Sequence, residues 1–491
     1  MVREESFRVQ SSWADKPFCY RAPYPEGALT PYEFQLAGAE YCLARKHALI
    51  GDEPGLGKTC QTILISNAIE AKSTLVICPA SLRLNWEREI WKWSTIENVQ
   101  TYPVLKSKDG VHLKSNYLII SYDLLRNPSL LSALLSKTWD HLILDEAHLL
   151  KDPKGNKRTK TICAEDGLRN VVGRMTLATG TILPNQPIEC YNAIRLLDWD
   201  AIDRMSIESF RRHYYAEGGG WIRGPHKVKD KKTKEWVTVN EVRWSEHVRN
   251  VPQNLGELQE RLRTNIMVRR LTKEVLKELP SSRWHMFPLI TNTAIKKALK
   301  HPGWGDAEKM YQMDPNGFSG AIPIEGAVST ARRLLGEAKA LSIVAYVKDL
   351  MNSGVQKLVI GAWHHSVLDI LRQNLVQFGL TYMDGRTSPI NKQLAVDNFQ
   401  QDNEISIILG QMLPLGEGWN LHSAQDVVLA EPDWVPGKNE QLLRRILRIG
   451  QKGRSLIGHV PLIPDTLEEK IVRRAIEKDI TIYKTLDERE R

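Results

Sequence analysis

The chain has 491 residues, enough for two to four domains of ordinary size, each with its own core. Hydrophobic residues make up 42% and charged residues 25%, which is typical of globular proteins and argues against a disordered one. No apolar run approaches the roughly 18 residues that a membrane helix needs, and no apolar stretch follows the polar N-terminus as in a secretory signal peptide. The composition therefore predicts a cytoplasmic protein without a membrane partner.

The basic residues outnumber the acidic ones by 67 to 58, which gives a formal net charge of +9. This excess is compatible with a polyanionic partner such as nucleic acid, and equally with a surface that is merely basic. The six cysteines form no C-x-x-C pair and all lie in the first two fifths of the chain. They indicate neither a disulfide framework nor a zinc site, and they fit a reducing compartment.

The N-terminal part of the chain predicts an irregular lead-in followed by an α/β unit. Residues 1–28 are polar and contain three prolines, whereas residues 29–205 alternate short apolar runs with helical patterns. Strands are predicted at 48–50, 74–78, 117–120, 142–144 and 175–178, and helices at 58–70 and 82–93. Continuous apolar runs separated by helices are typical of a parallel sheet that is covered on both faces.

The alternation stops after about residue 205, and residues 206–281 are predicted to be an insertion and a helical linker. Within it, residues 221–244 combine lysines with Trp221, Trp236 and Trp244. This segment could track a DNA backbone or act as a wedge at a DNA junction, or it could be a solvated hairpin with a small tryptophan core. Residues 282–491 resume the alternation and predict a second α/β lobe, with strands at 357–360, 405–409 and 427–429 and a last helix from Thr466.

A glycine-rich loop with the sequence GDEPGLGKT lies between the first predicted strand and helix, at residues 51–59. Its glycines allow the backbone N–H groups to face a phosphate chain, and the helix start adds positive potential. Lys58 would reach the β- and γ-phosphates of ATP, and the Thr59 hydroxyl would hold Mg²⁺. The usual G-x-x-x-x-G-K-[ST] pattern has glycine where this chain has Asp52, and a chance glycine turn is the alternative. The predicted nucleotide-binding residues of the loop are Asp52, Glu53, Pro54, Gly55, Leu56, Gly57, Lys58 and Thr59.

Two carboxylates, Asp145 and Glu146, follow directly on the apolar strand at 142–144. Charges at the end of a buried strand are costly unless they serve a cation or a proton transfer. Asp145 is predicted to coordinate the magnesium through water, and Glu146 to orient and deprotonate the attacking water. Alone, the pair could be a strand-end turn, but the phosphate loop in the same unit favours the catalytic interpretation.

At these motifs the sequence resembles the Swi/Snf family of superfamily 2 helicases, whose phosphate loop D-E-x-G-L-G-K-T has no glycine at the place of Asp52. The resemblance covers roughly residues 28–485. In the first unit it rests on LTPYEFQ (29–35), CPASL (78–82) with Trp86, ISYD (120–123), DEAH (145–148) and ATGT (178–181). In the second unit it rests on DGRTS (384–388), GEGWNL (416–421) and QLLRRILRIGQ (441–451).

The resemblance implies two RecA-like lobes with ATP and Mg²⁺ bound between them. It further implies that Gln35 reads adenine, that Gly418 and Gln441 belong to the nucleotide site, and that the motif with Trp86 lies along a DNA strand. Within the family, the chain looks most like the annealing-helicase (HARP-type) subfamily, through NLGEL (254–258), RRL (269–271) with LP (279–280), and GEAK (336–339). Departures from the family pattern lie at Gln411-Met412, Val435, Arg444 and Leu447; Arg444 stands where aspartate is common. These departures concern the coupling of the lobes rather than the ATP site.

Arg445 and Arg448 are spaced i, i+3, which puts both guanidinium groups on one helical face. ATP hydrolysis spreads negative charge over the γ-phosphoryl oxygens, and an arginine from outside the phosphate loop can contribute roughly 10³–10⁵ in rate. Alone, the pair could be a solvated basic face. With the other motifs, both are predicted to be catalytic together with Lys58 and Glu146. Closure of the two lobes would then complete the site and move the DNA-contacting surfaces.

The predicted function is a DNA-dependent ATPase that moves on double-stranded DNA and remodels or reanneals forked DNA, located with the nucleoid or in the nucleus. Three alternatives remain open. The chain could be a strand-separating helicase for DNA or RNA, a motor subunit of a restriction or defence complex, or a catalytically silent DNA-binding scaffold. The intact Lys58, Asp145, Glu146, Arg445 and Arg448 argue against the scaffold.

Overall fold

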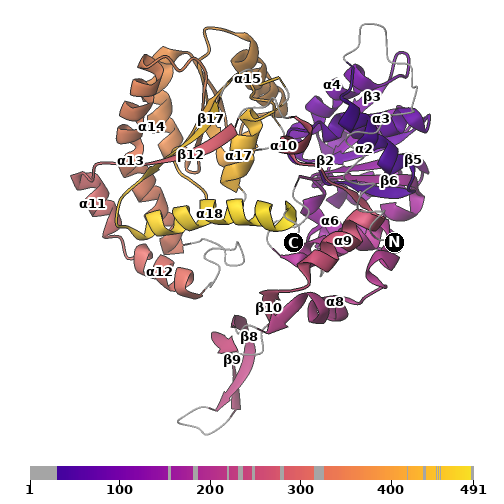
Figure 1. Ribbon diagram of the computed structural model, residues 1–491, viewed down its shortest axis with the longest axis horizontal. Helices are drawn as coiled ribbons and strands as arrows, with labels where there is room; N and C mark the ends of the chain where they lie inside the picture. The colour runs from indigo at the N-terminus through magenta and orange to yellow at the C-terminus, as the bar shows by residue number, and fades with distance from the viewer. Residues whose placement is uncertain are drawn as a thin grey trace.

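The computed structural model describes residues 30–152, 156–180, 186–217, 220–229, 236–245, 249–276, 281–313, 326–416, 419–434, 438–448, 450–451, 453 and 455–487. The predicted lead-in at 1–28, Gly418 and Val435 lie outside these residues. Two lobes lie side by side, lobe 1 in indigo to violet and lobe 2 in orange to yellow, and a hairpin projects away from both (Figure 1).

Lobe 1 is built on a parallel sheet with the strand order β11-β1-β6-β5-β2-β4-β3. Its strands are β1 (His47–Ile50), β2 (Thr74–Cys78), β3 (Thr101–Pro103), β4 (Tyr117–Ser121), β5 (Trp139–Asp145), β6 (Val172–Ala178) and β11 (Met267–Val268). Its α-helices are α2 (Glu33–Leu43), α3 (Lys58–Ala68), α4 (Arg83–Trp93), α5 (Pro128–Leu135), α6 (Lys157–Cys163) and α7 (Tyr191–Leu197). The five strands predicted for this lobe are confirmed, and β3 and β11 add to them.

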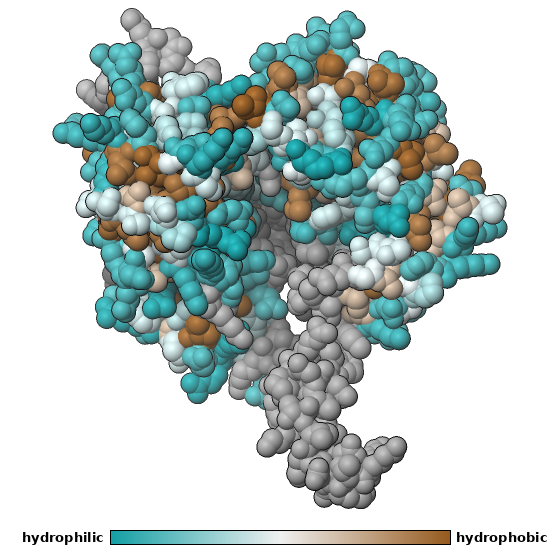
Figure 2. Space-filling model, turned by 180° about the vertical axis from the view of Figure 1, so that it is seen from behind, coloured by the Kyte–Doolittle hydropathy of each residue, from teal (hydrophilic) through white to brown (hydrophobic). Residues whose placement is uncertain are grey.

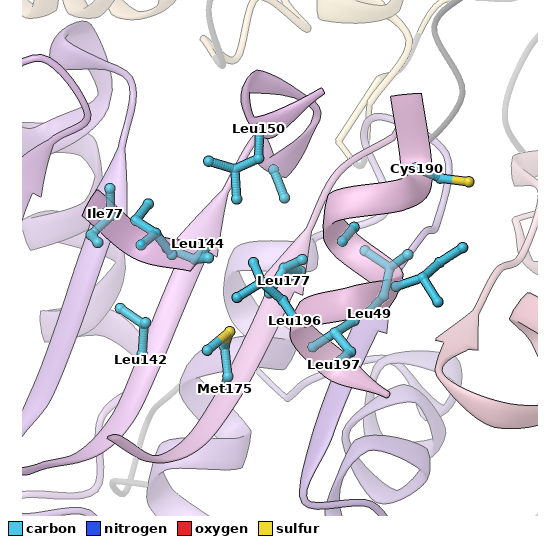
Figure 3. Close-up of a cluster of buried hydrophobic side chains, with 14 of the residues drawn as sticks. Leu49, Ile77, Leu142, Leu144, Leu150, Met175, Leu177, Cys190, Leu196 and Leu197 are labelled. Carbon is cyan, nitrogen blue, oxygen red and sulfur yellow. The ribbon is translucent and has the colours of Figure 1, made fainter. Parts of the chain in front are cut away.

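Both faces of this sheet are covered, as the continuous apolar strands predict. On β5, Leu142 and Leu144 pack with Leu177 and Leu196 on one face, seen in Figure 3. Ile143, which lies between them in the sequence, joins the core on the other face, beneath α2, α3 and α4. Successive side chains of a strand point to opposite faces, so one short strand supplies two cores. Burial of such a side chain contributes about 1.5–3 kcal/mol.

The linker between the lobes carries helices and two antiparallel strand pairs. Its elements are α8 (Ile207–Tyr214), β7 (Tyr215–Glu217), β8 (Gly220–Lys229), β9 (Trp236–Ser245), β10 (Arg249–Pro252), α9 (Leu255–Asn265) and α10 (Thr272–Val275). β8 and β9 pair as a long hairpin in which Trp221 is opposite Trp244. The hairpin stands away from both lobes (Figure 1). The backbone of this segment is therefore a hairpin, as one of the two interpretations of residues 221–244 predicts. Contact of the hairpin with DNA stays a prediction.

Lobe 2 contains a second parallel sheet, with the strand order β12-β17-β16-β13-β15-β14. Its strands are β12 (Ser281–Pro288), β13 (Leu358–Ala362), β14 (Leu380–Met383), β15 (Ile407–Gln411), β16 (Asp426–Leu429) and β17 (Ser455–Leu462). Its α-helices are α11 (Thr293–Leu299), α12 (Gly303–Met313), α13 (Gly326–Asn352), α14 (His365–Leu375), α15 (Pro389–Gln401), α16 (Met412–Gly416), α17 (Lys438–Ile446) and α18 (Leu467–Asp487). The fold class, two parallel-sheet lobes joined by a partly helical insertion, is confirmed.

Hydrophilic side chains predominate on the face of the molecule that Figure 2 shows, and apolar ones form separate groups on both lobes. Some large apolar side chains are exposed, such as Trp91 and Ile290. Within the described ranges, no helix combines the length and the apolar character that crossing a bilayer demands.

Lobe 2 is held together partly by an ion pair in its interior. Lys339 of α13 is completely buried, and its Nζ lies 2.7 Å from Oε1 of the buried Glu468 at the start of α18. A buried charge that loses its partner is far more costly than a fully apolar replacement of the pair.

We expect Lys339→Ala to lower the free energy of unfolding of lobe 2 by about 3–5 kcal/mol, because Glu468 would remain buried without a counter-charge. Urea denaturation followed by circular dichroism measures this loss. The control is Arg473→Ala on α18, which removes the exposed Arg473–Glu469 pair and should change stability by less than about 1 kcal/mol. Lys339→Met combined with Glu468→Leu should recover most of the loss, and failure to do so would contradict an electrostatic cause.

Candidate functional site

The glycine-rich loop connects β1 to α3 at the carboxyl edge of the lobe 1 sheet. Gly57 is the N-cap of α3 and has a φ of 71°, and Gly55 has a φ of 94°. Both angles lie in the left-handed region, which glycine adopts without steric cost. A Cβ at Gly57 would also lie 2.2 Å from the Gln35 amide nitrogen. The two glycines therefore allow the tight turn on which the phosphate-binding prediction depends.

Gln35, the predicted adenine reader, is fixed beside this loop. It is buried in α2, and its Nε2 donates to the Leu56 carbonyl at 3.2 Å. Its Oε1 accepts the backbone N–H of Tyr32 at 3.0 Å. The side chain therefore ties the segment before α2 to the phosphate loop, next to the position where the first turn of α3 begins.

Lys58 occupies the first position of α3, and its ammonium group donates to the carbonyls of Asp52 at 2.9 Å and Glu53 at 3.1 Å. Burial lowers the pKa of Lys58 to about 8, although Glu146 and Asp52 counteract the shift. The amine thus lies at the centre of the loop, where a phosphate chain with its negative charge would favour the protonated form.

Asp52, which stands where the usual pattern has glycine, is completely buried and paired with Arg270. The Arg270 Nη2 lies 2.5 Å from Asp52 Oδ2, and its Nε lies 3.0 Å from Asp52 Oδ1. Gln61 Nε2 also donates to Asp52 Oδ2 at 2.9 Å. Arg270 follows β11, so this bidentate pair joins the phosphate loop to the segment that leads toward lobe 2. The aspartate is therefore part of an internal support of the loop.

Asp145 lies at the end of β5, and hydrogen bonds hold it from two sides. The Trp86 indole N–H donates to Asp145 Oδ2 at 2.8 Å, and the Tyr122 hydroxyl donates to the Asp145 carbonyl at 2.8 Å. Burial and the neighbouring Glu146 raise the pKa of Asp145 above its usual range. Trp86 itself is 1% exposed, so its side chain orients a carboxylate inside the lobe and does not line the surface.

Glu146 has a φ of 50°, in the left-handed region, which costs a residue with a side chain on the order of 1–3 kcal/mol. His148 Nδ1 lies 3.2 Å from Glu146 Oε2 and 3.1 Å from the Thr179 hydroxyl. Burial would raise the pKa of Glu146, but the hydrogen bond and charge of His148 and the charge of Arg445 hold it below its usual range. At neutral pH this carboxylate is ionised and able to accept a proton.

The two predicted arginines reach the same place from lobe 2. Arg445, at the end of α17, is 3% exposed; its Nε donates to the Gly416 carbonyl at 2.8 Å, and its Nη2 lies 3.9 Å from Glu146 Oε1. Arg448 approaches the loop closely, because a Cβ at Gly55 would lie 3.2 Å from Arg448 Cγ. Burial and the charge of Arg445 lower the pKa of Arg448 to about 9, against the attraction of Glu146. The lobes thus meet with arginines on one side and the phosphate loop on the other.

The structure thus brings the loop residues, Gln35, Asp145, Glu146, Arg445 and Arg448 to one interface. Gln441, on α17, contacts this region only indirectly: a Cβ at Gly416 would lie 3.7 Å from its Oε1. The predicted Gly418 lies outside the described residues.

Several supporting residues were not predicted from the sequence, or were given other roles. Arg270 belongs to the RRL sequence at 269–271, which predicts only the subfamily. Trp86 belongs to a motif for which the resemblance implies a place along a DNA strand. Spacing does not reveal their roles, since Arg270 lies 218 residues from Asp52 and Trp86 lies 59 residues from Asp145.

We expect Lys58→Ala to abolish ATP hydrolysis because the loop loses its positive point charge. Glu146→Gln should still bind ATP but hydrolyse it at least 10²-fold more slowly, since an amide cannot accept the proton of the water. Nucleotide binding by fluorescence and phosphate release measure the two effects. The control is Lys46→Ala, an exposed lysine of the same lobe. Hydrolysis by Glu146→Gln at the parental rate would refute the assignment of the base.

We expect Arg270→Ala to destabilise lobe 1 by about 3–5 kcal/mol, because Asp52 would stay buried without its partner. The same change should weaken ATP binding, since Asp52 would no longer be held in the loop. Thermal unfolding and nucleotide titration measure the two losses. Arg270→Ala combined with Asp52→Gly restores the usual loop pattern and should recover stability; no recovery would contradict the pairing as the cause.

Comparisons with known proteins indicate the family of the chain. A model of the SNF2-related domain matches residues 34–317, and a model of the helicase conserved C-terminal domain matches residues 341–450. The chain is 28% identical over 422 residues to a Xenopus tropicalis protein named SWI/SNF-related matrix-associated actin-dependent regulator of chromatin subfamily A-like protein 1 (85% of this chain, 41% of the relative). It is 27% identical over 427 residues to the human DNA annealing helicase and endonuclease ZRANB3 (85% of this chain, 37% of the relative).

The chain therefore spans about two fifths of the length of these relatives. Among solved structures, the Sulfolobus solfataricus SWI2/SNF2 ATPase core in complex with dsDNA is similar with a TM-score of 0.42 and 18% identity, over 95% of this chain and 94% of that chain. The SNF2-related model alone matches more than half of the 491 residues, and the predicted resemblance is confirmed. With a phosphate loop that faces paired arginines across two parallel-sheet lobes, the chain belongs to the SNF2 family of helicase-related ATPases.

Proposed function

We propose that the chain is a DNA-dependent ATPase that translocates on double-stranded DNA and remodels or reanneals branched DNA. The observation that carries this proposal is the interface between the lobes, where Arg445 lies 3.9 Å from Glu146 and Arg448 lies against Gly55. An ATP site that needs both lobes couples hydrolysis to their relative movement. We propose the divisions 29–205 for the first lobe, 206–281 for the insertion and linker, and 282–491 for the second lobe.

In this proposal Lys58 holds the β- and γ-phosphates and Gln35 reads the adenine. Glu146 orients the attacking water and takes its proton; the carboxylate is ionised at neutral pH, and His148 Nδ1, 3.2 Å from its Oε2, holds it in position. Arg445 and Arg448 stabilise the charge that develops on the γ-phosphoryl group when the lobes are closed. Gly418 and Gln441 complete the nucleotide site from the second lobe.

The Thr59 hydroxyl and the Asp145 carboxylate are the residues that we propose to hold Mg²⁺. Both are hard oxygen donors, which this ion prefers, and the Trp86 indole N–H orients one Asp145 oxygen. When bound, the ion would neutralise phosphate charge during hydrolysis. The residues at the end of β5 and the start of α3 therefore fit a magnesium-dependent nucleotide site.

DNA is the partner that we propose. A net charge of +9 suits a polyanion, and the relatives named above include a DNA annealing helicase. Motors of this type contact mainly the backbone of the duplex, which implies little dependence on sequence. With DNA as the track, we expect the protein in the nucleoid or the nucleus. Strand separation is the second candidate, because the hairpin of β8 and β9 stands away from both lobes (Figure 1).

We expect Arg448→Ala and Arg445→Ala to leave nucleotide binding nearly intact and to lower turnover by at least tenfold. The guanidinium groups would meet the phosphate mainly in the closed state, so their loss affects the transition state more than the ground state. Steady-state kinetics measure turnover, and nucleotide titration measures affinity. Arg473→Ala on α18 is the control, because this side chain is exposed. A large loss of ATP affinity with unchanged turnover would contradict the proposed role.

We expect double-stranded or forked DNA to stimulate the ATPase more than single strands of equal length. Duplex DNA has the denser phosphate charge, and the preference for it follows from the family. ATP should drive triplex displacement or fork regression with little unwinding of a plain duplex. Phosphate release and strand-displacement assays measure these activities. Stimulation by single strands alone, together with efficient unwinding of a tailed duplex, would favour the strand-separating helicase instead.

A further inference from the structure

An ion pair connects the two lobes beside the proposed catalytic arginines. Arg444 of α17 places its Nη1 3.1 Å from Oε1 of Glu53, a residue of the phosphate loop. The side chains are 13% and 8% exposed, so water screens the pair only weakly. Among the described residues two further pairs also join the lobes: Arg445 with Glu146 at the longer distance of 3.9 Å, and Arg88 with Asp397, whose side chains are 50% and 28% exposed and which contributes less.

Each partner also has a contact outside this pair. The Arg444 Nε donates to Glu440 Oε1 at 2.7 Å, one turn earlier on α17. Glu53 Oε2 accepts the backbone N–H of Thr272 at 2.7 Å, at the start of α10. Opening of the lobes would therefore break the Arg444–Glu53 pair, while Arg444 keeps its hydrogen bond to Glu440 and Glu53 keeps the one from Thr272. Both side chains are therefore oriented before the lobes meet, and the ion pair forms when they do.

The charge of Glu53 also depends on this contact. Burial would raise the pKa of Glu53, but the Arg444 guanidinium and the hydrogen bond from Thr272 hold it below its usual range. In the closed arrangement a neutral residue at position 444 would leave the loop carboxylate buried with less compensation.

We propose that Arg444 is a positioning residue that holds the lobes closed through Glu53, and so sets the fraction of molecules in which Arg445 and Arg448 can reach the phosphate. This rests on the proposed ATP-driven cycle. Arg444 would act on the equilibrium between open and closed lobes and not on the reacting atoms. Its effect on turnover would therefore follow the population of the closed state.

The test compares Arg444→Gln with the parental chain and with Arg333→Gln. Arg333 forms the same i, i+4 pair with a glutamate, Glu337 at 2.6 Å, but both residues lie on α13 within lobe 2. Small-angle X-ray scattering without nucleotide should give a larger radius of gyration for Arg444→Gln only. DNA-stimulated turnover should fall about tenfold in Arg444→Gln, and binding of a fluorescent ATP analogue should change by less than about twofold. Arg444→Lys should recover part of the turnover, because lysine keeps the positive charge beside Glu53. The recovery should be incomplete, because a single ammonium group cannot bind Glu440 and Glu53 together as the guanidinium does.

A double-mutant cycle with Glu53→Gln distinguishes a direct pair from two independent effects. The combined variant should be no slower than the slower single variant, whereas losses that multiply would overturn the proposal. Parental scattering and turnover in Arg444→Gln would also overturn it. If the parental chain hydrolyses no ATP with any DNA, the proposed function fails, and scattering alone still decides the closing role of Arg444.

Discussion

The burial of two carboxylates in the phosphate loop is the constraint on which the rest of the structure depends. Asp52 is completely buried and Glu53 nearly so, and neither finds a counter-charge within the loop other than Lys58, whose charge is needed for phosphate. Their partners come from elsewhere in the chain: Arg270 after β11 for Asp52, and Arg444 of lobe 2 for Glu53. Because a buried carboxylate without a partner is costly, contacts with the linker and the second lobe stabilise the observed form of the loop.

This dependence gives the two lobes different parts in the chemistry. In the proposed mechanism, lobe 1 supplies the binding groups and the base on one edge of a parallel sheet, where the carboxyl ends of its strands meet. Lobe 2 supplies arginines from α17 and the segment that follows it. A site divided in this way is complete only when the lobes touch, which links the state of the nucleotide to the relative position of two large bodies. Supporting contacts such as Trp86 with Asp145 and His148 with Glu146 keep each half ready for closure.

Comparison of the predicted and observed elements shows where sequence patterns carry information. The buried central strand β2 was predicted with its observed bounds, and β5 was predicted only at its apolar part, residues 142–144, three residues after its observed start. Strands β3, β11, β12, β14 and β17 were not predicted. Four of them, β3, β11, β12 and β14, lie at the edges of their sheets, and β11 has only two residues. Edge strands gain their order from pairing with a neighbour, so their own side chains need not be apolar.

The sequence by itself determined the fold class and the family, and it predicted the candidate nucleotide-site residues, because glycine turns, strand-end carboxylates and spaced arginines are local patterns that the chemistry requires. Only the tertiary structure decided how these groups are supported. The pairing of Asp52 with Arg270, of Asp145 with Trp86 and of Glu53 with Arg444 joins residues between 59 and 391 positions apart. No local pattern encodes such contacts, since they arise from the packing of a helix on a sheet and of one lobe on the other.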